Sequence, residues 1–224
     1  MEDVSFSVLE LFKLGGLFMW PLLLFSIATI AISIERAVYL LYHNLRVDDI
    51  SVKVSEYAAN NDYSGADEYL SAQTKRRMGA RVFRELLKRS NVEKNFSEHR
   101  AEKAAETEAM NCLNSLENGF NFLTALGSLS PLTGFLGTVS GMIGAFRSIA
   151  EATEVNAQIV ANGIYEALIT TVFGLIIAII AMISHSIFSH IVNRFAVSVE
   201  GSCSDLIAQL ARQADTPKTD QTGT

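Results

Sequence analysis

The segment that decides the fold runs from Ala161 to Ala181 and reads ANGIYEALITTVFGLIIAIIA. It contains one carboxylate, Glu166, and the chain then has no Asp, Glu, Lys or Arg from Ala167 to Asn193. A helix needs roughly 20 apolar residues to cross the hydrocarbon core of a bilayer, and this run is longer. A carboxylate at the edge of such a span is costly in lipid unless it faces a cavity or a partner. Glu166 is therefore the first candidate for a functional residue.

Two further stretches without charged residues make a three-span membrane protein the leading interpretation. They extend from Leu14 to Ile34 and from Asn118 to Phe146, and each is long enough to span a bilayer. The alternative is a soluble helical domain with three buried helices, which a length of 224 residues and a hydrophobic content of 49% would allow. Buried helices of soluble domains rarely stay uncharged for so long, so the pattern predicts an all-α integral membrane protein with three transmembrane helices.

The distribution of basic residues predicts the orientation of these spans. Residues 43–117 hold 12 of the 18 Lys and Arg residues, whereas Lys13 alone precedes the first span and Arg147 alone lies at the connection between the second and third. Because Lys and Arg accumulate in cytoplasmic loops, residues 43–117 and the C-terminus are expected in the cytoplasm, and the N-terminus outside. The predicted segments are 1–16 (surface helix, outside), 17–42 (first span), 43–117 (cytoplasmic helical region), 118–149 (second span), 150–162 (short outer loop), 163–193 (third span) and 194–224 (cytoplasmic helix and tail).

The second and third spans are expected to be long and to extend into the cytoplasmic helical region. Residues 95–98 (NFSE) resemble a capping box at the start of a helix. Neither Pro nor Gly follows before Gly119, so this helix is predicted to run straight into the second span.

Several classes of function find no support in the sequence. No Ser/His/Asp, metal-ligand or phosphate-loop constellation occurs, so neither an enzyme active site nor a metal or cofactor is expected. Cys112 and Cys203 stand alone, without CxxC spacing, and are interpreted as inert. The net charge of −6 is spread along the chain, and no basic cluster with aromatic residues suggests nucleic acid. For His185 and His190, near the cytoplasmic end of the third span, a boundary role is preferred over a proton relay.

Small residues form a stripe on one face of each of the last two spans. At 100° per residue, the stripe of the second span comprises Thr124, Gly127, Pro131, Gly134, Thr138, Gly141 and Ala145. That of the third span comprises Gly163, Ala167, Thr170, Gly174, Ala178 and Ala181, with Glu166 on one flank and Thr171 on the other. Small residues let helices approach closely and can also border water or another helix. The candidates for helix packing or pore lining are Gly134, Gly141, Ala167 and Gly174.

Two motifs resemble the signature of the ExbB/TolQ/MotA proton-channel family. Residues 131–141 read PLTGFLGTVSG and match P-x-x-G-x-x-G-T-V-x-G, and residues 164–175 read IYEALITTVFGL and match E-A-L-x-x-T. A short outer loop separates the two, and the pair together is specific. The topology extends the resemblance over nearly the whole chain. Three spans resemble the ExbB/TolQ branch, since flagellar MotA proteins carry a fourth.

The resemblance implies a homo-pentamer whose second and third spans line a central pore. It further implies a dimer of an ExbD/TolR-like partner with one span per chain inside that pore, and a TonB/TolA-like protein beyond it. By motif position, Thr138, Glu166 and Thr171 correspond to pore-lining polar residues. Thr170 is an additional hydroxyl, so which of the two threonines faces the pore stays open.

The function implied is a proton-channel and stator subunit in the bacterial inner membrane that couples the proton motive force to work at the cell envelope. Two alternatives remain: a stand-alone cation channel in which a ring of Glu166 carboxylates sets selectivity, and a passive scaffold in which the small residues only pack helices. The sequence distinguishes neither proton from sodium specificity nor TonB-type uptake from Tol-Pal maintenance.

Overall fold

The computed structural model describes residues 12, 15–90, 96–151 and 157–215, and the regular structure within these ranges is α-helical throughout. Three helical runs are long and apolar enough to cross a membrane, as predicted. The surface helix predicted for residues 1–16 lies almost wholly outside the described residues. The helices are α2 (Met19–Tyr42), α3 (Asp48–Ala59), α4 (Tyr63–Gln73), α5 (Met78–Ser90), α6 (Glu98–Glu117), α7 (Phe120–Glu151) and α8 (Ala157–Asp215).

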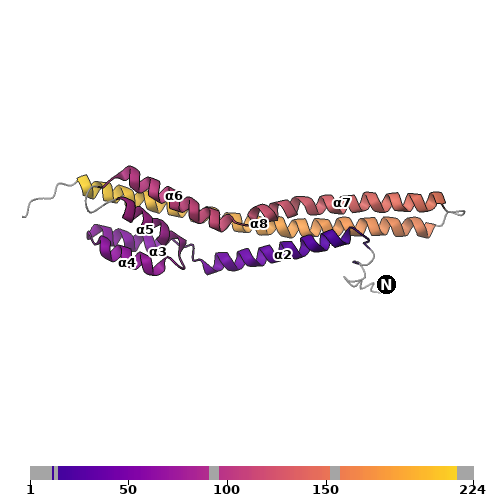
Figure 1. The fold of residues 1–224 in the computed structure, drawn as a ribbon, viewed down its shortest axis with the longest axis horizontal. Coiled ribbons are helices and arrows are strands. Elements are labelled where there is room, and N and C mark those ends of the chain that lie inside the picture. Colours follow the sequence, from indigo (N-terminus) through magenta and orange to yellow (C-terminus); the bar gives the residue numbers. More distant parts are fainter. Residues whose placement is uncertain (1–11, 13–14, 91–95, 152–156, 216–224) are drawn as a thin grey trace, which may run out of the picture. The chain divides into compact units, whose positions relative to one another are not determined.

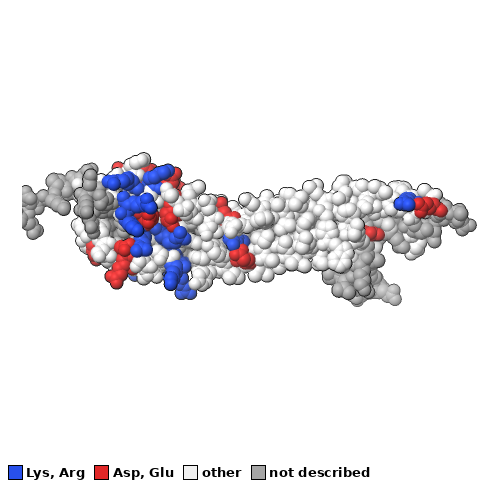
Figure 2. All heavy atoms as spheres, viewed as in Figure 1, with Lys and Arg blue, Asp and Glu red and all other residues white. Residues whose placement is uncertain are grey.

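The chain divides into two compact units. The first holds the described residues of Met1–Arg36 and Gly119–Ile187, and the second those of Ala37–Asn118 and Phe188–Thr224. In the first unit, α7 and the first half of α8 lie side by side in opposite directions, and the start of α2 packs on α8 (Figure 1). Figure 2 shows charged side chains gathered on the second unit, whereas the first is almost free of them on this face. Such an uncharged surface suits contact with lipid.

α8 continues far beyond the apolar run that begins it. It is one helix from Ala157 to Asp215, so the predicted boundary between residues 193 and 194 falls inside a helix. No proline, the strongest helix breaker, occurs in this range. Beyond the span, buried residues recur every three or four positions and keep one face of the helix apolar. They are Val192, Phe195, Val199, Cys203, Leu206 and Leu210.

The helix predicted to run unbroken into the second span is interrupted, so that prediction was wrong. α6 ends at Glu117, α7 begins at Phe120, and Gly119 between them has a φ of +87°. Residues with a side chain rarely adopt this left-handed conformation, whereas glycine does so without steric cost. The N–H groups of Phe122 and Leu123 donate to the carbonyl of Gly119 at 3.1 and 3.3 Å, which starts the new helix.

α5 supplies the centre of the second unit. It packs against α4 and α6, and Val82, Phe83 and Leu86 are fully buried there. On the outer side of α5, Arg84 donates to the carboxylate of Asp67 at 2.7 Å. This hydrogen bond lowers the pKa of the Asp67 carboxyl. Because the pair is exposed, it contributes less to stability than the apolar core beneath it.

Two glutamines connect the end of α8 to α3. The side-chain amide of Gln209 donates to the carbonyl of Ser55 at 3.0 Å, and that of Gln213 donates to the carbonyl of Ala58 at 3.1 Å. Both carbonyls lie in the last turns of α3, so the two amides join that end of α3 to α8. The C-terminal part of α8 therefore belongs to the second unit.

Replacing Phe83 with alanine should destabilise the second unit. The side chain is 0% exposed, and removing a buried phenylalanine costs about 3–5 kcal/mol of unfolding free energy. Val52→Ala on α3 is the control, because Val52 is 59% exposed. Thermal unfolding of the purified protein in detergent should show a large drop in the melting temperature for Phe83→Ala alone. Equal drops in both variants would contradict the assignment of this core.

Candidate functional site

α7 and α8 meet along a face that consists mainly of small residues on both helices. α7 contributes Gly127, Ser130, Gly134, Gly137, Gly141 and Ala145. α8 contributes Gly163, Ala167, Thr170, Gly174, Ala178 and Ala181. Small residues of this kind let membrane helices approach until their backbones touch. The four candidates for packing or pore lining all lie in this contact within one chain.

The contact leaves no room for a Cβ atom at four glycines, one of which is Gly163, where an added Cβ would lie 2.5 Å from Cβ of Ala145. A Cβ on Gly174 would lie 2.5 Å from the carbonyl oxygen of Ser130, and one on Gly134 would lie 2.7 Å from the carbonyl oxygen of Thr170. A Cβ on Gly137 would lie 2.5 Å from the Oγ1 atom of Thr170. Any side chain at these positions must therefore push the two helices apart.

The adjacent threonines Thr170 and Thr171 occupy different environments. Thr170 is 1% exposed, and its hydroxyl lies 2.7 Å from the carbonyl oxygen of Ala167 and 3.2 Å from that of Gly134. Thr171 is only half-buried, and its hydroxyl donates to the same Gly134 carbonyl at 3.2 Å. Thr170 is thus enclosed between the helices, whereas Thr171 lies at the edge of their contact.

Thr138 lies on the same edge as Thr171. It is half-buried, and its hydroxyl donates to the carbonyl of Phe135 at 2.6 Å. Thr138 follows Gly137, which faces α8, just as Thr171 follows Thr170, which faces α7. Successive residues of an α-helix are turned by about 100°. Since the two helices are antiparallel, Thr138 and Thr171 are turned toward the same side of the contact.

The predicted stripe on α7 was confirmed at Gly127, Gly134, Gly141 and Ala145 and was wrong at its other three positions. It ran through Thr124, Pro131 and Thr138, whereas Ser130 and Gly137 are buried against α8 and Thr124 is exposed. Sequence reasoning missed both buried residues. Spacings of three and four residues alternate through Gly127, Ser130, Gly134, Gly137 and Gly141, but they also alternate through the predicted stripe. Periodicity alone therefore does not choose between the two.

Glu166 lies on the opposite edge of the contact, which α8 turns toward the start of α2. Its side chain is half-buried, and its carboxylate lies against the backbone of Gly16, just before α2 begins. One turn further along the same face of α8 begins an apolar cluster. This cluster comprises Met19, Leu22, Ile169 and Ile177, with Phe12, Phe25 and Phe173 packed against it. The structure therefore places Thr138 and Thr171 on one edge of the contact and Glu166 on the other.

These groups give the membrane unit two kinds of polar chemistry. A threonine hydroxyl can donate and accept hydrogen bonds without carrying charge, and a carboxylate can take up and release a proton. Polar groups are costly in an apolar medium unless they have partners. The three hydroxyls find theirs in backbone carbonyls of α7 and α8, and their oxygens keep the capacity to accept a further proton donor.

A sequence profile places these residues in a known family. The profile of the MotA/TolQ/ExbB proton channel family matches residues 74–201, more than half of the chain. The matched range contains α7 and the part of α8 that carries Glu166, Thr170 and Thr171. The chain belongs to the MotA/TolQ/ExbB proton channel family.

Curated relatives in the family fall on the ExbB and TolQ side. The biopolymer transport protein ExbB of Pseudomonas putida is 31% identical over 45% of this chain and 31% of its own length. The Tol-Pal system protein TolQ of Haemophilus influenzae is 38% identical over 46% of this chain and 45% of its own length. The chain therefore spans less than half of the length of these two relatives. An ExbB-like biopolymer transport protein of Synechocystis is 32% identical over 83% of this chain and 87% of its own length.

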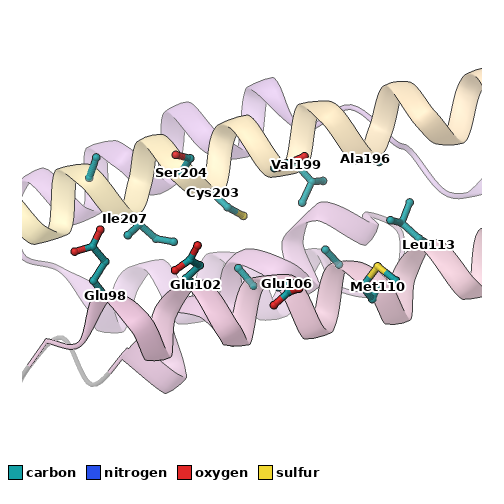
Figure 3. Close-up of a pocket in the computed structure, with 14 residues that line it drawn as sticks. Glu98, Glu102, Glu106, Met110, Leu113, Ala196, Val199, Cys203, Ser204 and Ile207 are labelled. Atoms are coloured by element: carbon teal, nitrogen blue, oxygen red, sulfur yellow. The ribbon is translucent and has the colours of Figure 1, made fainter.

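The second unit contains a groove that holds none of the predicted site residues. It lies between α6 and the C-terminal part of α8 and has a volume of about 620 Å³. Glu98, Glu102 and Glu106 follow one another along α6, and Cys203 and Ile207 face them from α8 (Figure 3). The family's polar motif residues lie in the other unit, so the groove is separate from the candidate site.

Adding one methyl group at Gly137 should weaken the α7–α8 contact. In Gly137→Ala the new Cβ would lie 2.5 Å from Oγ1 and 2.8 Å from Cβ of Thr170, and overpacking of this kind costs about 1–3 kcal/mol. Gly144→Ala on the same helix is the matched control, because a Cβ there meets nothing within 4 Å. Melting temperatures of the detergent-purified proteins should fall for Gly137→Ala and hold for Gly144→Ala. Similar temperatures for both variants would contradict the close contact.

Proposed function

We propose that this chain is the channel-forming subunit of a membrane motor driven by the proton motive force, of the ExbB/TolQ type. Membership of a proton channel family supports proton conduction, and the names of the relatives support a role in biopolymer transport or in a Tol-Pal system. The proposed location is the bacterial inner membrane, with the N-terminus in the periplasm and the C-terminus in the cytoplasm. The basic residues concentrated in residues 43–117 support this orientation.

The observation that carries the proposal is the edge of the α7–α8 contact at which Thr138 and Thr171 lie together. Two half-buried hydroxyls at neighbouring levels offer uncharged stations for a proton in an otherwise apolar span. We assign this edge to the pore. Thr170 is assigned to packing, because it is enclosed between the helices.

The proposed assembly is a homo-pentamer with α7 and α8 around the pore and an ExbD/TolR-like single-span partner inside it. A TonB/TolA-like protein would receive the force. Large exposed apolar side chains on both helices support an assembly, because they require cover by lipid or by other helices. On α7 these include Leu132, Phe135 and Ile143, and on α8 Leu168, Val172 and Ile179.

The energy for this work comes from moving protons across the membrane. One charge crossing 100 mV releases about 2.3 kcal/mol. In the proposed mechanism, an acidic group on the partner helix carries the proton, and Thr138 and Thr171 hydrogen-bond to it during transfer. Glu166 sets the electrostatic potential near the outer end of α8 and attracts the proton there. Successive orientations of the partner inside the ring then convert proton flow into force.

Removing single hydroxyls should separate transport from packing. Thr171→Val should abolish most proton flux and leave the melting temperature nearly unchanged, because its hydroxyl lies at the proposed pore edge. Thr170→Val should lower stability by about 1 kcal/mol, the net worth of one hydrogen bond, and retain flux. Flux is measured with a pH-sensitive dye in liposomes that contain the purified complex with its single-span partner. Equal loss of flux in both variants would contradict the assignment of the two threonines.

Glu166→Gln keeps the shape of the side chain and removes its charge, so it should abolish proton-driven work while the complex still assembles. Flux and co-purification of the partner are measured on the same preparation. Strong conduction by this chain without any partner would favour a stand-alone channel. Full activity of both Glu166→Gln and Thr138→Val would favour a passive scaffold and refute the proposed function.

A further inference from the structure

The turn that precedes α2 lies directly against Glu166. Gly15 and Gly16 form this turn, and the N–H of Met19 donates to the carbonyl of Gly16 at 3.3 Å. A Cβ atom on Gly15 would collide with the side chain of Met19 and lie 3.4 Å from Cγ2 of Ile169. A Cβ atom on Gly16 would lie only 1.8 Å from carboxylate Oε1 of Glu166, which is a severe overlap. Since Glu166 and Ile169 are one turn apart on α8, the two glycines contact adjacent positions of one helix face.

Two independent features require glycine at position 16. Its φ is +66°, in the left-handed region that residues with a side chain rarely adopt. In addition, the space that a side chain would occupy is filled by Glu166, whose Cδ and Cγ would lie 2.9 and 3.6 Å from an added Cβ. Gly119 has the first feature without the second. Its φ is +87°, but an added Cβ would meet its nearest neighbours at 3.6–3.7 Å, which is ordinary contact.

We propose that Gly16 is a positioning residue for Glu166: its lack of a side chain lets the carboxylate lie over the α2 turn, which selects one conformation of the glutamate. Glu166 lies on the edge of the α7–α8 contact that is turned toward the α2 turn. The apolar cluster of Met19, Leu22, Ile169 and Ile177 fixes the turn against α8, so the space over Gly16 is held at a constant position. The first span thereby governs where the negative charge of the third span lies.

Only the expected effect of Gly16 on proton flux rests on the proposed function. If Glu166 sets the potential at the outer end of the pore, then a substitution at Gly16 moves that charge without removing it. The expected effect is a displaced pH profile of proton flux. The positioning itself is a statement about two side-chain positions and can be measured without any transport assay.

The test is a set of Gly16→Ala variants of the full chain, purified in detergent, with Gly119→Ala as the matched control. Both substitutions place an alanine at a positive φ, but only Gly16→Ala also displaces the carboxylate. Gly16→Ala should lower the melting temperature with Glu166 or with Glu166→Gln, which has the same shape. With Glu166→Ala, which removes the obstructing atoms, most of the additional loss should disappear. Gly119→Ala should cost the same in all three backgrounds.

A second measurement follows the carboxylate directly. Carbodiimide labelling of Glu166, read by mass spectrometry as a function of pH, should become several-fold faster in Gly16→Ala, because the displaced carboxylate loses its cover. Labelling in Gly119→Ala should match the unsubstituted chain. If Gly16→Ala does not fold, the double variant with Glu166→Asp, whose carboxylate is one methylene shorter, should restore folding.

The outcomes are distinguishable. Equal melting losses for Gly16→Ala in all backgrounds, or unchanged labelling, would overturn the positioning role, as would failure of both Glu166→Asp and Glu166→Ala to rescue a non-folding variant. Coupling between positions 16 and 166 together with full proton flux in Glu166→Gln would keep the positioning role and refute the proposed function.

Discussion

The close approach of α7 and α8 is the constraint on which the rest of the membrane unit depends. Gly134, Gly137 and Gly174 leave no space for a Cβ atom, so the helices touch through their backbones. This brings the carbonyl of Gly134 within reach of the hydroxyls of Thr170 and Thr171. In lipid, helices associate through van der Waals contact and interhelical hydrogen bonds, since no hydrophobic effect drives them together. The glycines of α7 allow both the van der Waals contact and the interhelical hydrogen bonds.

Because one side of α8 is used for this contact, its two edges have different surroundings. One edge carries Thr171 beside Thr138 of α7, and the other carries Glu166 beside the turn before α2. The angular position of a polar residue around α8 therefore decides which helix it lies beside. The glycine turn before α2 and the apolar cluster that α2 shares with α8 surround Glu166. Among the described residues, Glu166 is the only carboxylate between Glu151 and Glu200.

The helical architecture and the buried face of α8 could be predicted from the sequence, because long uncharged runs and a single small-residue stripe leave little choice of period. The face of α7 could be predicted only in part, at Gly127, Gly134, Gly141 and Ala145. Small residues occupy so many of its positions that two neighbouring stripes fit, and only the contacts of Ser130 and Gly137 decide between them. The contact between Gly16 and Glu166 joins positions 150 residues apart, and no periodicity encodes it. The break at Gly119 depends on its positive φ. Glycine permits this conformation, but a glycine in the sequence does not by itself predict it.

The adjacent threonines show how contacts refine what a motif leaves open. Thr170 lies directly over Gly137, and a Cβ on that glycine would meet its Oγ1, Cβ and Cγ2 atoms at 2.5, 2.8 and 3.2 Å. A larger residue at position 170 would overfill this space, and a smaller one would leave a void between the helices. A valine would fill it but would lose the hydrogen bond. Threonine therefore satisfies packing and hydrogen bonding together at position 170. Thr171 donates to the same Gly134 carbonyl but is only half-buried, so the two adjacent threonines differ in exposure and share one backbone partner.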